Sequence, residues 1–224
     1  MGRNNAFIVW EDANIDAAVK AAITARMLNS GQSCIAAKRF ILMEGIYDEF
    51  VTKFTKALKQ LKTGDSIEEA TKVGPTARKD LADQLQSQVE ESIRAGATLL
   101  FGGRQKECYH EPTILSDVKP AGMPAFDEET FGPLVAMIKV KAEEEAFELS
   151  ELSKYGQGVT VCTTNIEKAL AMSDYVSDGA YFINELVKYD PRRPFGGAKR
   201  SGYGRELAKD GMREFINRKT IYVK

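Results

Sequence analysis

Three short stretches of this sequence combine residue types that can do chemistry, and the first carries a thiol. Residues 31–34 read GQSC and fall between a predicted helix and a predicted strand. Such loops in α/β proteins hold reactive groups because their backbone amides can face a ligand. Nearby amide donors lower the pKa of a thiol, so Cys34 is a candidate nucleophile. The alternative is a buried structural cysteine, which composition alone favours.

The second stretch, EETFGP at residues 128–133, places two carboxylates beside an aromatic ring. One carboxylate could accept hydrogen bonds from the hydroxyls of a ligand, and the ring of Phe131 could pack against a flat heterocycle. Taken alone, the stretch is better explained as a charged turn that leads into the strand predicted from Leu134.

The third stretch, PFGGAKRSGYGRE at residues 194–206, is rich in glycine, which permits a tight, irregular loop. It is not a dinucleotide-binding fingerprint, because Leu207 occupies the place of the third glycine and no clear strand leads into it. Its basic side chains could bind phosphate or could simply be solvated. Each of the three stretches is weak evidence by itself.

Strands alternate with helices along the chain, which predicts an α/β fold with a largely parallel sheet flanked by helices. Asn14 is the predicted N-cap of a helix that ends near Gly31, where glycine can take the left-handed conformation after the helix. The other predicted helices are 47–61, 81–93, 143–152 and 166–176. The predicted strands are 6–10, 39–43, 98–101, 134–140, 158–162, 180–183 and 219–223. The last strand must pair inside the sheet or with another subunit.

The composition excludes several classes of protein. The chain of 224 residues is 43% hydrophobic and 28% charged, and its net charge of −1 gives no overall attraction to nucleic acid or anionic lipid. No apolar run is long enough to span a membrane and no signal peptide is visible, so we expect a cytoplasmic protein without nucleic-acid or membrane partners. The scattered thiols and the single histidine predict no metal site; they are Cys34, Cys108, Cys162 and His110.

Together and in this order, the three stretches resemble the signatures of the NAD(P)-dependent aldehyde dehydrogenases. The similarity runs from residue 4 to the end of the chain, and the surrounding segments NGQSCIAAKRF and NELVKYDPRRPFGG look most like bacterial succinate-semialdehyde dehydrogenases. The resemblance implies an aldehyde dehydrogenase catalytic domain over residues 1–212 and a C-terminal oligomerisation strand over residues 213–224 that bridges subunits. The implied partners are a small aldehyde substrate and further copies of the chain.

The resemblance also implies roles for single residues. Cys34 matches the nucleophile: its thiolate attacks the aldehyde, the thiohemiacetal passes hydride to the nicotinamide, and water hydrolyses the thioester. Glu129 matches the residue that hydrogen-bonds the nicotinamide ribose, and Phe131 matches the ring near the nicotinamide. The implied substrate side of the pocket consists of Ser33 and Ile35, which flank the nucleophile, together with Asn184 and Phe195. The candidate cations for an anionic substrate tail are Lys188, Arg192 and Arg193.

Where the chain departs from the family, the resemblance puts activity in doubt. A whole member also has an N-terminal cofactor-binding domain, which carries the general-base glutamate and the residues that select NAD or NADP. We therefore expect NAD or NADP to bind weakly or not at all, and the chain alone to be inactive or nearly so. Two alternatives remain open. One is a non-catalytic remnant that acts as an interaction module, and the other is a reductase of the same superfamily linked to acyl-CoA or acyl phosphate.

Overall fold

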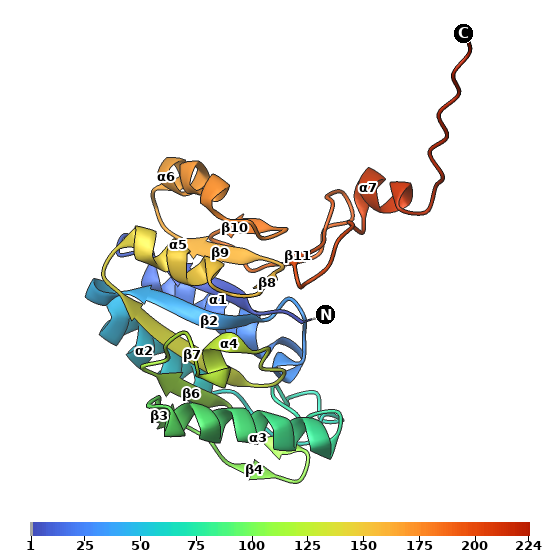
Figure 1. Ribbon diagram of the computed structural model, residues 1–224. Coiled ribbons are helices and arrows are strands. Elements are labelled where there is room, and N and C mark those ends of the chain that lie inside the picture. The colour runs from blue at the N-terminus through green and yellow to red at the C-terminus, as the bar shows by residue number, and fades with distance from the viewer. Residues whose placement is uncertain (1) are drawn as a thin grey trace.

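The computed structural model describes residues 2–224, which form an α/β fold around one seven-stranded sheet (Figure 1). The strand order is β10-β9-β1-β2-β7-β6-β3, and neighbouring strands are parallel except β6 and β3. The bounds of these strands are β1 Asn5–Val9, β2 Ala37–Met43, β3 Thr98–Phe101, β6 Thr113–Ser116, β7 Leu134–Val140, β9 Val159–Cys162 and β10 Tyr181–Ile183. Two small antiparallel pairs join β4 Gln105–Lys106 to β5 Tyr109–His110 and β8 Tyr155–Gly156 to β11 Ala198–Lys199.

Seven α-helices accompany these strands within the described residues. Helix α1 begins after Asn14, whose side chain accepts a hydrogen bond from the backbone N–H of Ala17 at 3.0 Å, as the predicted N-cap requires. The bounds of the helices are α1 Ile15–Met27, α2 Glu44–Lys59, α3 Lys79–Arg94, α4 Pro124–Asp127, α5 Glu143–Glu151, α6 Ile166–Ala171 and α7 Ala208–Arg213.

Helices cover both faces of the sheet, and this double coverage explains why its central strands are apolar. On one face α1 and α2 pack together (Figure 1). On this face the Phe40 ring of β2 lies 5.6 Å from the Phe54 ring of α2. On the other face the ring of Trp10, just after β1, meets the ring of Phe147 of α5 edge-on at 6.2 Å. All five residues of β1 are buried, as expected for a parallel strand covered on both sides.

The longer elements agree with the sequence-based predictions, and the differences concern short ones. The five predicted helices and the first six predicted strands are present, with ends that differ by a few residues. Strand β6, which lies between β7 and β3, is not predicted, because only Ile114 and Leu115 of its four residues are apolar. Helix α7 is not predicted because it is short and contains Gly211, a poor helix former.

The C-terminal residues 214–224, which we call the C-terminal arm, extend away from the rest of the molecule (Figure 1). The predicted strand 219–223 is not formed in the single chain, so the first of the two alternatives, pairing inside the chain's own sheet, is not found. The arm nevertheless exposes large apolar side chains: Phe215 is 92% exposed and Tyr222 is 82% exposed. Pairing with a second subunit stays a prediction.

Candidate active site

Cys34 lies in the loop that connects α1 to β2, and the backbone of this loop is unusual. After the end of α1, Asn29, Ser30 and Gly31 take left-handed conformations with φ of 51°, 56° and 73°. The Asn29 side chain stabilises the turn by donating a hydrogen bond to the carbonyl oxygen of Gln32 at 2.9 Å. The left-handed residue that first follows the helix is therefore Asn29 and not Gly31, a correction that fits the tolerance of asparagine for this conformation. We call residues 29–36 the thiol loop.

The thiol loop is in contact with residues 128–133, the segment before β7 that we call the carboxylate loop. A Cβ atom on Gly31 would meet the carbonyl oxygen of Gly132, so the two backbones approach too closely for a side chain. The φ of 73° at Gly31 is a second reason for glycine at this position. Two of the three stretches singled out in the sequence are thus in direct contact.

Arg26 of α1 links the same two loops and is fully buried. Its guanidinium donates to the carbonyl oxygens of Ala37 at 3.2 Å and Thr130 at 3.0 Å, and it also donates to that of Gly132. Burial lowers the pKa of Arg26 to about 9 against the opposing effect of Glu129, so the side chain remains charged at neutral pH. A buried charge that satisfies several carbonyls fixes the backbone, because moving any of them would leave polar groups unpaired.

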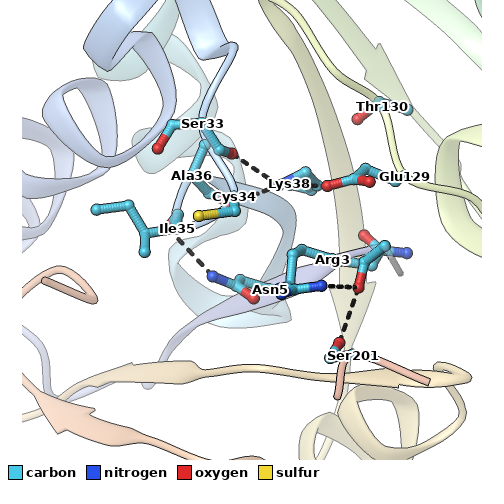
Figure 2. Close-up of polar contacts among 12 residues, drawn as sticks. Arg3, Asn5, Ser33, Cys34, Ile35, Ala36, Lys38, Glu129, Thr130 and Ser201 are labelled. Carbon is cyan, nitrogen blue, oxygen red and sulfur yellow. Dashed lines mark hydrogen bonds and ion pairs between the residues drawn. The ribbon is translucent and has the colours of Figure 1, made fainter. Parts of the chain in front are cut away.

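Helix α3 holds the carboxylate loop from another side. The buried Gln88 donates from Nε2 to the Glu128 carboxylate at 2.8 Å and to the carbonyl oxygen of Glu129 at 3.2 Å. Glu128 is therefore an anchor of the loop. The side chain of Glu129 is directed toward the thiol loop, as Figure 2 shows. The structure thus assigns different surroundings to the two adjacent carboxylates.

Lys38 of β2 connects the thiol loop to the side chain of Glu129 (Figure 2). Its side chain is fully buried, and Nζ donates to the carbonyl oxygens of Ser33 at 3.3 Å and Ala36 at 3.1 Å. The same Nζ lies 4.0 Å from Oε1 of Glu129. Burial, followed by the positive charge of Arg26, lowers the pKa of Lys38 to about 7, whereas Glu129 acts in the opposite direction.

The thiol of Cys34 is half-buried, and its sulfur lies 3.2 Å from the hydroxyl oxygen of Tyr189. Burial and the neighbouring sulfur hold the pKa of Tyr189 above its ordinary value, so the phenol stays protonated at neutral pH and can donate to a thiolate. The ring of Tyr189 packs on Phe195 with centroids 4.5 Å apart. The thiol loop is also held by Asn5 of β1, which donates to the carbonyl oxygen of Ile35 at 3.1 Å (Figure 2).

Tyr189 was not among the predicted site residues. The only sequence signal for it is its position in the loop that also carries Lys188 and Phe195. Of the predicted substrate residues, Ser33 and Ile35 flank the thiol, and Phe195 approaches it through the Tyr189 ring. These three residues are therefore brought to one place by the fold.

The other two predicted substrate residues are engaged by different partners. The amide of Asn184 accepts a hydrogen bond from the backbone N–H of Thr163 at 2.9 Å and donates to its carbonyl oxygen at 2.8 Å. Lys188 forms an ion pair with Glu185 at 2.6 Å. It also lines, with Phe195, a cavity of about 450 Å³ whose lining does not include Cys34. Substrate-binding roles for Asn184 and Lys188 stay predictions.

A second cavity, of about 570 Å³, lies beside the carboxylate loop. Its lining includes both predicted cofactor residues, Glu129 and Phe131, with Gln88 of α3 and two cations from other segments, Lys154 and Arg200. The Phe131 ring is 37% exposed, so it is accessible to a ligand. A carboxylate for hydroxyls, an aromatic ring for a heterocycle and cations for phosphates fit the chemistry of a dinucleotide.

The remaining thiols and the histidine have other surroundings. Cys162 is buried in β9, and burial raises the pKa of its thiol to about 12, as expected for a structural cysteine. His110 is buried, its Nδ1 lies 2.8 Å from the carbonyl oxygen of Glu111, and burial lowers its pKa. Over residues 2–224, no group of three or more His, Cys, Asp or Glu side chains is arranged to hold a metal ion. None of the helices in this range is both long and apolar enough to traverse a lipid bilayer.

Comparison with known proteins shows the family to which the chain belongs. Residues 1–221 match the aldehyde dehydrogenase family. The chain belongs to this family. It is 44% identical over 226 residues to a probable NADP⁺-dependent succinate-semialdehyde dehydrogenase of Synechocystis sp., covering 100% of this chain and 50% of that protein. It is also 44% identical over 225 residues to an NAD(P)⁺-dependent succinate-semialdehyde dehydrogenase of Escherichia coli, covering 99% of this chain and 48% of that protein.

The aldehyde dehydrogenase fold is equally clear from solved structures. The chain aligns with Gox0499, a protein studied for its selection of cofactor and substrate, with a TM-score of 0.94 and 39% identity. The alignment covers 100% of this chain and 49% of that one. The predicted fold class and the predicted family are therefore confirmed. The chain spans about half the length of the aldehyde dehydrogenases that it matches.

Proposed function

We propose that this chain supplies the thiol-bearing part of an NAD(P)-dependent aldehyde dehydrogenase that oxidises an aldehyde to a carboxylate. The observation that supports this most directly is the contact between the thiol loop and the carboxylate loop. Arg26 and Lys38 connect these loops through buried hydrogen bonds and an ion pair. The contact places a half-buried thiol near the carboxylate of a cavity whose side chains suit a dinucleotide.

In the proposed reaction, Cys34 is the nucleophile. Its thiolate sulfur attacks the carbonyl carbon of the aldehyde, and the π electron pair moves to the oxygen, which the backbone N–H of Cys34 stabilises in part. The hydroxyl of Tyr189 donates a hydrogen bond to the thiolate and so holds the sulfur in place before it attacks. Collapse of the tetrahedral adduct expels a hydride and leaves a thioester. Attack of water on the thioester breaks the carbon–sulfur bond, releases the carboxylic acid and one proton to solvent, and returns the thiolate.

NAD or NADP supplies the hydride acceptor when it is bound. Among the residues of this chain, Glu129 would accept hydrogen bonds from ribose hydroxyls, and the exposed ring of Phe131 would pack near the nicotinamide. Lys154 and Arg200 add positive charge to the same cavity. The names of the Synechocystis and Escherichia coli relatives specify NADP⁺ and NAD(P)⁺, respectively. The chain spans about half the length of these relatives, and we expect weak dinucleotide binding or none by the 224 residues alone.

Succinate semialdehyde is the proposed substrate, because both relatives named above are succinate-semialdehyde dehydrogenases. The anionic tail of this substrate needs a cation, and Lys188 lies in the same loop as Tyr189 and Phe195. If Lys188 binds the tail, Lys188→Ala should raise KM for succinate semialdehyde and leave KM for butanal unchanged. Equal changes for both aldehydes would remove Lys188 from the substrate site.

The decisive experiment measures NAD(P)H production from succinate semialdehyde by this chain and by a protein that also contains the upstream half found in its relatives. We expect activity only in the longer protein and only with Cys34 present. Turnover by the 224 residues alone at about 1 per second or faster would contradict the expected inactivity. A silent longer protein would contradict succinate semialdehyde as the substrate.

Association of subunits through the C-terminal arm is the second part of the proposal. Its support is the exposed apolar surface of Phe215, Ile221 and Tyr222, which the chain's own sheet does not cover. A strand formed by the arm against another copy would bury these side chains and satisfy its backbone hydrogen bonds. Sedimentation of the purified chain tests this association directly.

A further inference from the structure

Lys38 takes no part in the steps described above, yet it contacts both loops of the site. We propose that Lys38 is a positioning residue that orients the Cys34 thiol, stabilises its thiolate form and ties it to the Glu129 carboxylate. This inference rests on the proposed role of Cys34 as the nucleophile. It gives a lysine of strand β2 a role in the reactivity of the Cys34 thiol.

The geometry around Nζ supports this positioning role. Nζ donates to the carbonyl oxygens of Ser33 and Ala36, which lie on the two sides of Cys34 in the chain. Fixing these two carbonyls restrains the peptide planes around Cys34 and therefore the direction of its side chain. The ion pair with Glu129 attaches the same ammonium to the carboxylate loop (Figure 2). One side chain thus restrains both parts of the site.

Packing alone does not account for a lysine at this place. Strand β2 is buried along its whole length, and the Lys38 side chain is itself fully buried. A charged group in such surroundings is costly, and apolar replacements of buried ionic groups are often neutral or stabilising. A fully buried ammonium beside a reactive thiol is consistent with a role in reactivity.

The charges around Lys38 connect it to the thiol. Arg26 from α1 and Arg3 from the N-terminal segment disfavour its protonation, whereas Glu129 and a Cys34 thiolate favour it. Because electrostatic coupling is mutual, the protonated lysine favours the thiolate in turn. The reactivity of Cys34 with an alkylating reagent should therefore depend on Lys38, even in a protein that does not turn over aldehyde.

The test is the rate of alkylation of Cys34 by iodoacetamide as a function of pH, followed by mass spectrometry of the peptide that contains Cys34. The variants are Lys38→Met, which removes charge and hydrogen bonds, Lys38→Gln, which retains a hydrogen-bond donor, and Lys38→Arg, which retains the charge. The matched control is Lys139→Met on β7, because Lys139 is exposed and lies over the ring of Tyr47. Thermal unfolding of each variant is measured in parallel.

We expect Lys38→Met and Lys38→Gln to slow alkylation of Cys34 about tenfold at pH 6, where Lys38 is charged, and to slow it less above pH 8, where Lys38 has released its proton. Lys38→Gln should keep the plateau rate at high pH, whereas Lys38→Met should change it as well, because only the former can still hold the loop carbonyls. The alkylation rate of Lys38→Arg should stay within about twofold of the wild-type rate at pH 6. Lys139→Met should behave as the wild type.

A purely structural role for Lys38 would lower the unfolding temperature and leave the Cys34 profile unchanged. That result, in Lys38→Met and Lys38→Gln, would overturn the inference. If Lys38→Met does not fold, the comparison of Lys38→Gln with Lys38→Arg decides the question. Alkylation requires no aldehyde oxidation, so an inactive longer protein would contradict the proposed function and leave the result for Lys38 standing.

Discussion

The thiol site and the C-terminal arm are held in opposite ways. At the site, the buried cations Arg26 and Lys38 satisfy backbone carbonyls of two loops, and every one of these contacts lies within the chain. In the arm, apolar side chains such as Phe215 and Tyr222 are exposed to solvent. Buried charge and exposed apolar surface are both unfavourable for an isolated chain.

The comparison teaches that the two regions depend on different partners. The geometry of the thiol loop is determined by residues of this chain, so it should persist in the isolated 224 residues. The apolar side chains of the arm are not covered by the rest of the described chain, so the conformation of the arm should depend on contact with another subunit. Changes at the site should therefore alter chemistry or folding, and changes in the arm should alter association.

The largest expected effect is that of Cys34→Ala on turnover in a protein that includes the upstream half. Loss of the nucleophile should reduce NAD(P)H formation by at least about a thousandfold, because no thioester can form. The control is Cys108→Ala, which should keep activity near the wild-type value. Substantial activity in the Cys34 variant would assign the nucleophile to another residue.

Removing the guanidinium that joins the loops should destabilise the fold. Arg26→Met leaves the carbonyl oxygens of Ala37 and Thr130 without their buried donor, and we expect a loss of about 3 kcal/mol in the free energy of unfolding, measured in urea. The control is Arg192→Met, because Arg192 is exposed and pairs with Asp190 at the surface. That change should cost less than about 0.5 kcal/mol. Equal costs would show that burial of Arg26 contributes nothing to stability.

The pH dependence of stability should report the buried lysine. The pKa of Lys38 is about 7 in the folded chain and lies below the ordinary value of 10.5. Between these values the unfolded chain holds a proton that the folded chain has released, so stability rises as pH increases. Relative to Lys38→Met, the wild type should gain up to about 5 kcal/mol over this range. If the free energy of unfolding, measured in urea, depended on pH in the same way for both proteins, Lys38 would be solvated and its pKa would not be lowered.

The contact between the two loops should be sensitive to a single methyl group. Gly31→Ala would force a Cβ against the carbonyl of Gly132 at a φ of 73°, with an expected cost of about 2 kcal/mol and an altered alkylation rate of Cys34. Gly122→Ala is the control, because its φ is also positive but an added Cβ meets nothing within 4 Å. An unchanged alkylation rate in Gly31→Ala would show that the loop contact does not position the thiol.

The smallest effect on stability is expected in the arm. Phe215→Ser should change the free energy of unfolding by less than about 0.5 kcal/mol, because the side chain makes little contact with its own chain. The same change should weaken association in sedimentation velocity experiments, whereas Lys219→Ser should not. Unaltered association would exclude Phe215 from the subunit interface.

The positions of the reactive motifs could be predicted from the sequence, but their connections could not. Cys34 and Glu129 stand out as a loop thiol and an acidic residue before a strand, and the fold brings their loops together. Arg26 could not be recognised as a link, because a helical period that places apolar residues inside assigns charged ones to solvent. Its partner Thr130 is 104 positions away in sequence, and that contact depends on the whole sheet.

The same limitation applies to Tyr189. Its hydroxyl reaches Cys34 because β10 pairs with β9, which sets the path of the following loop, and the lack of local periodicity in that loop hides the contact. Short elements such as β6 escape prediction for a related reason. The existence of β6 depends on the strands it pairs with, and two successive apolar residues are too few to indicate a strand.

The parallel pairing of β2 with β7 sets the order of events during folding. Arg39 lies opposite Ala136 in this pair. Strands β2 and β7 must therefore pair before the carboxylate loop can lie beside the thiol loop. Contacts of such high contact order form slowly, because a long chain segment must be closed into a loop first. A nascent chain that has emerged only as far as α2 contains the thiol but none of the carboxylate loop. The thiol of Cys34 is therefore synthesised before the carboxylate loop that lies near it in the folded chain.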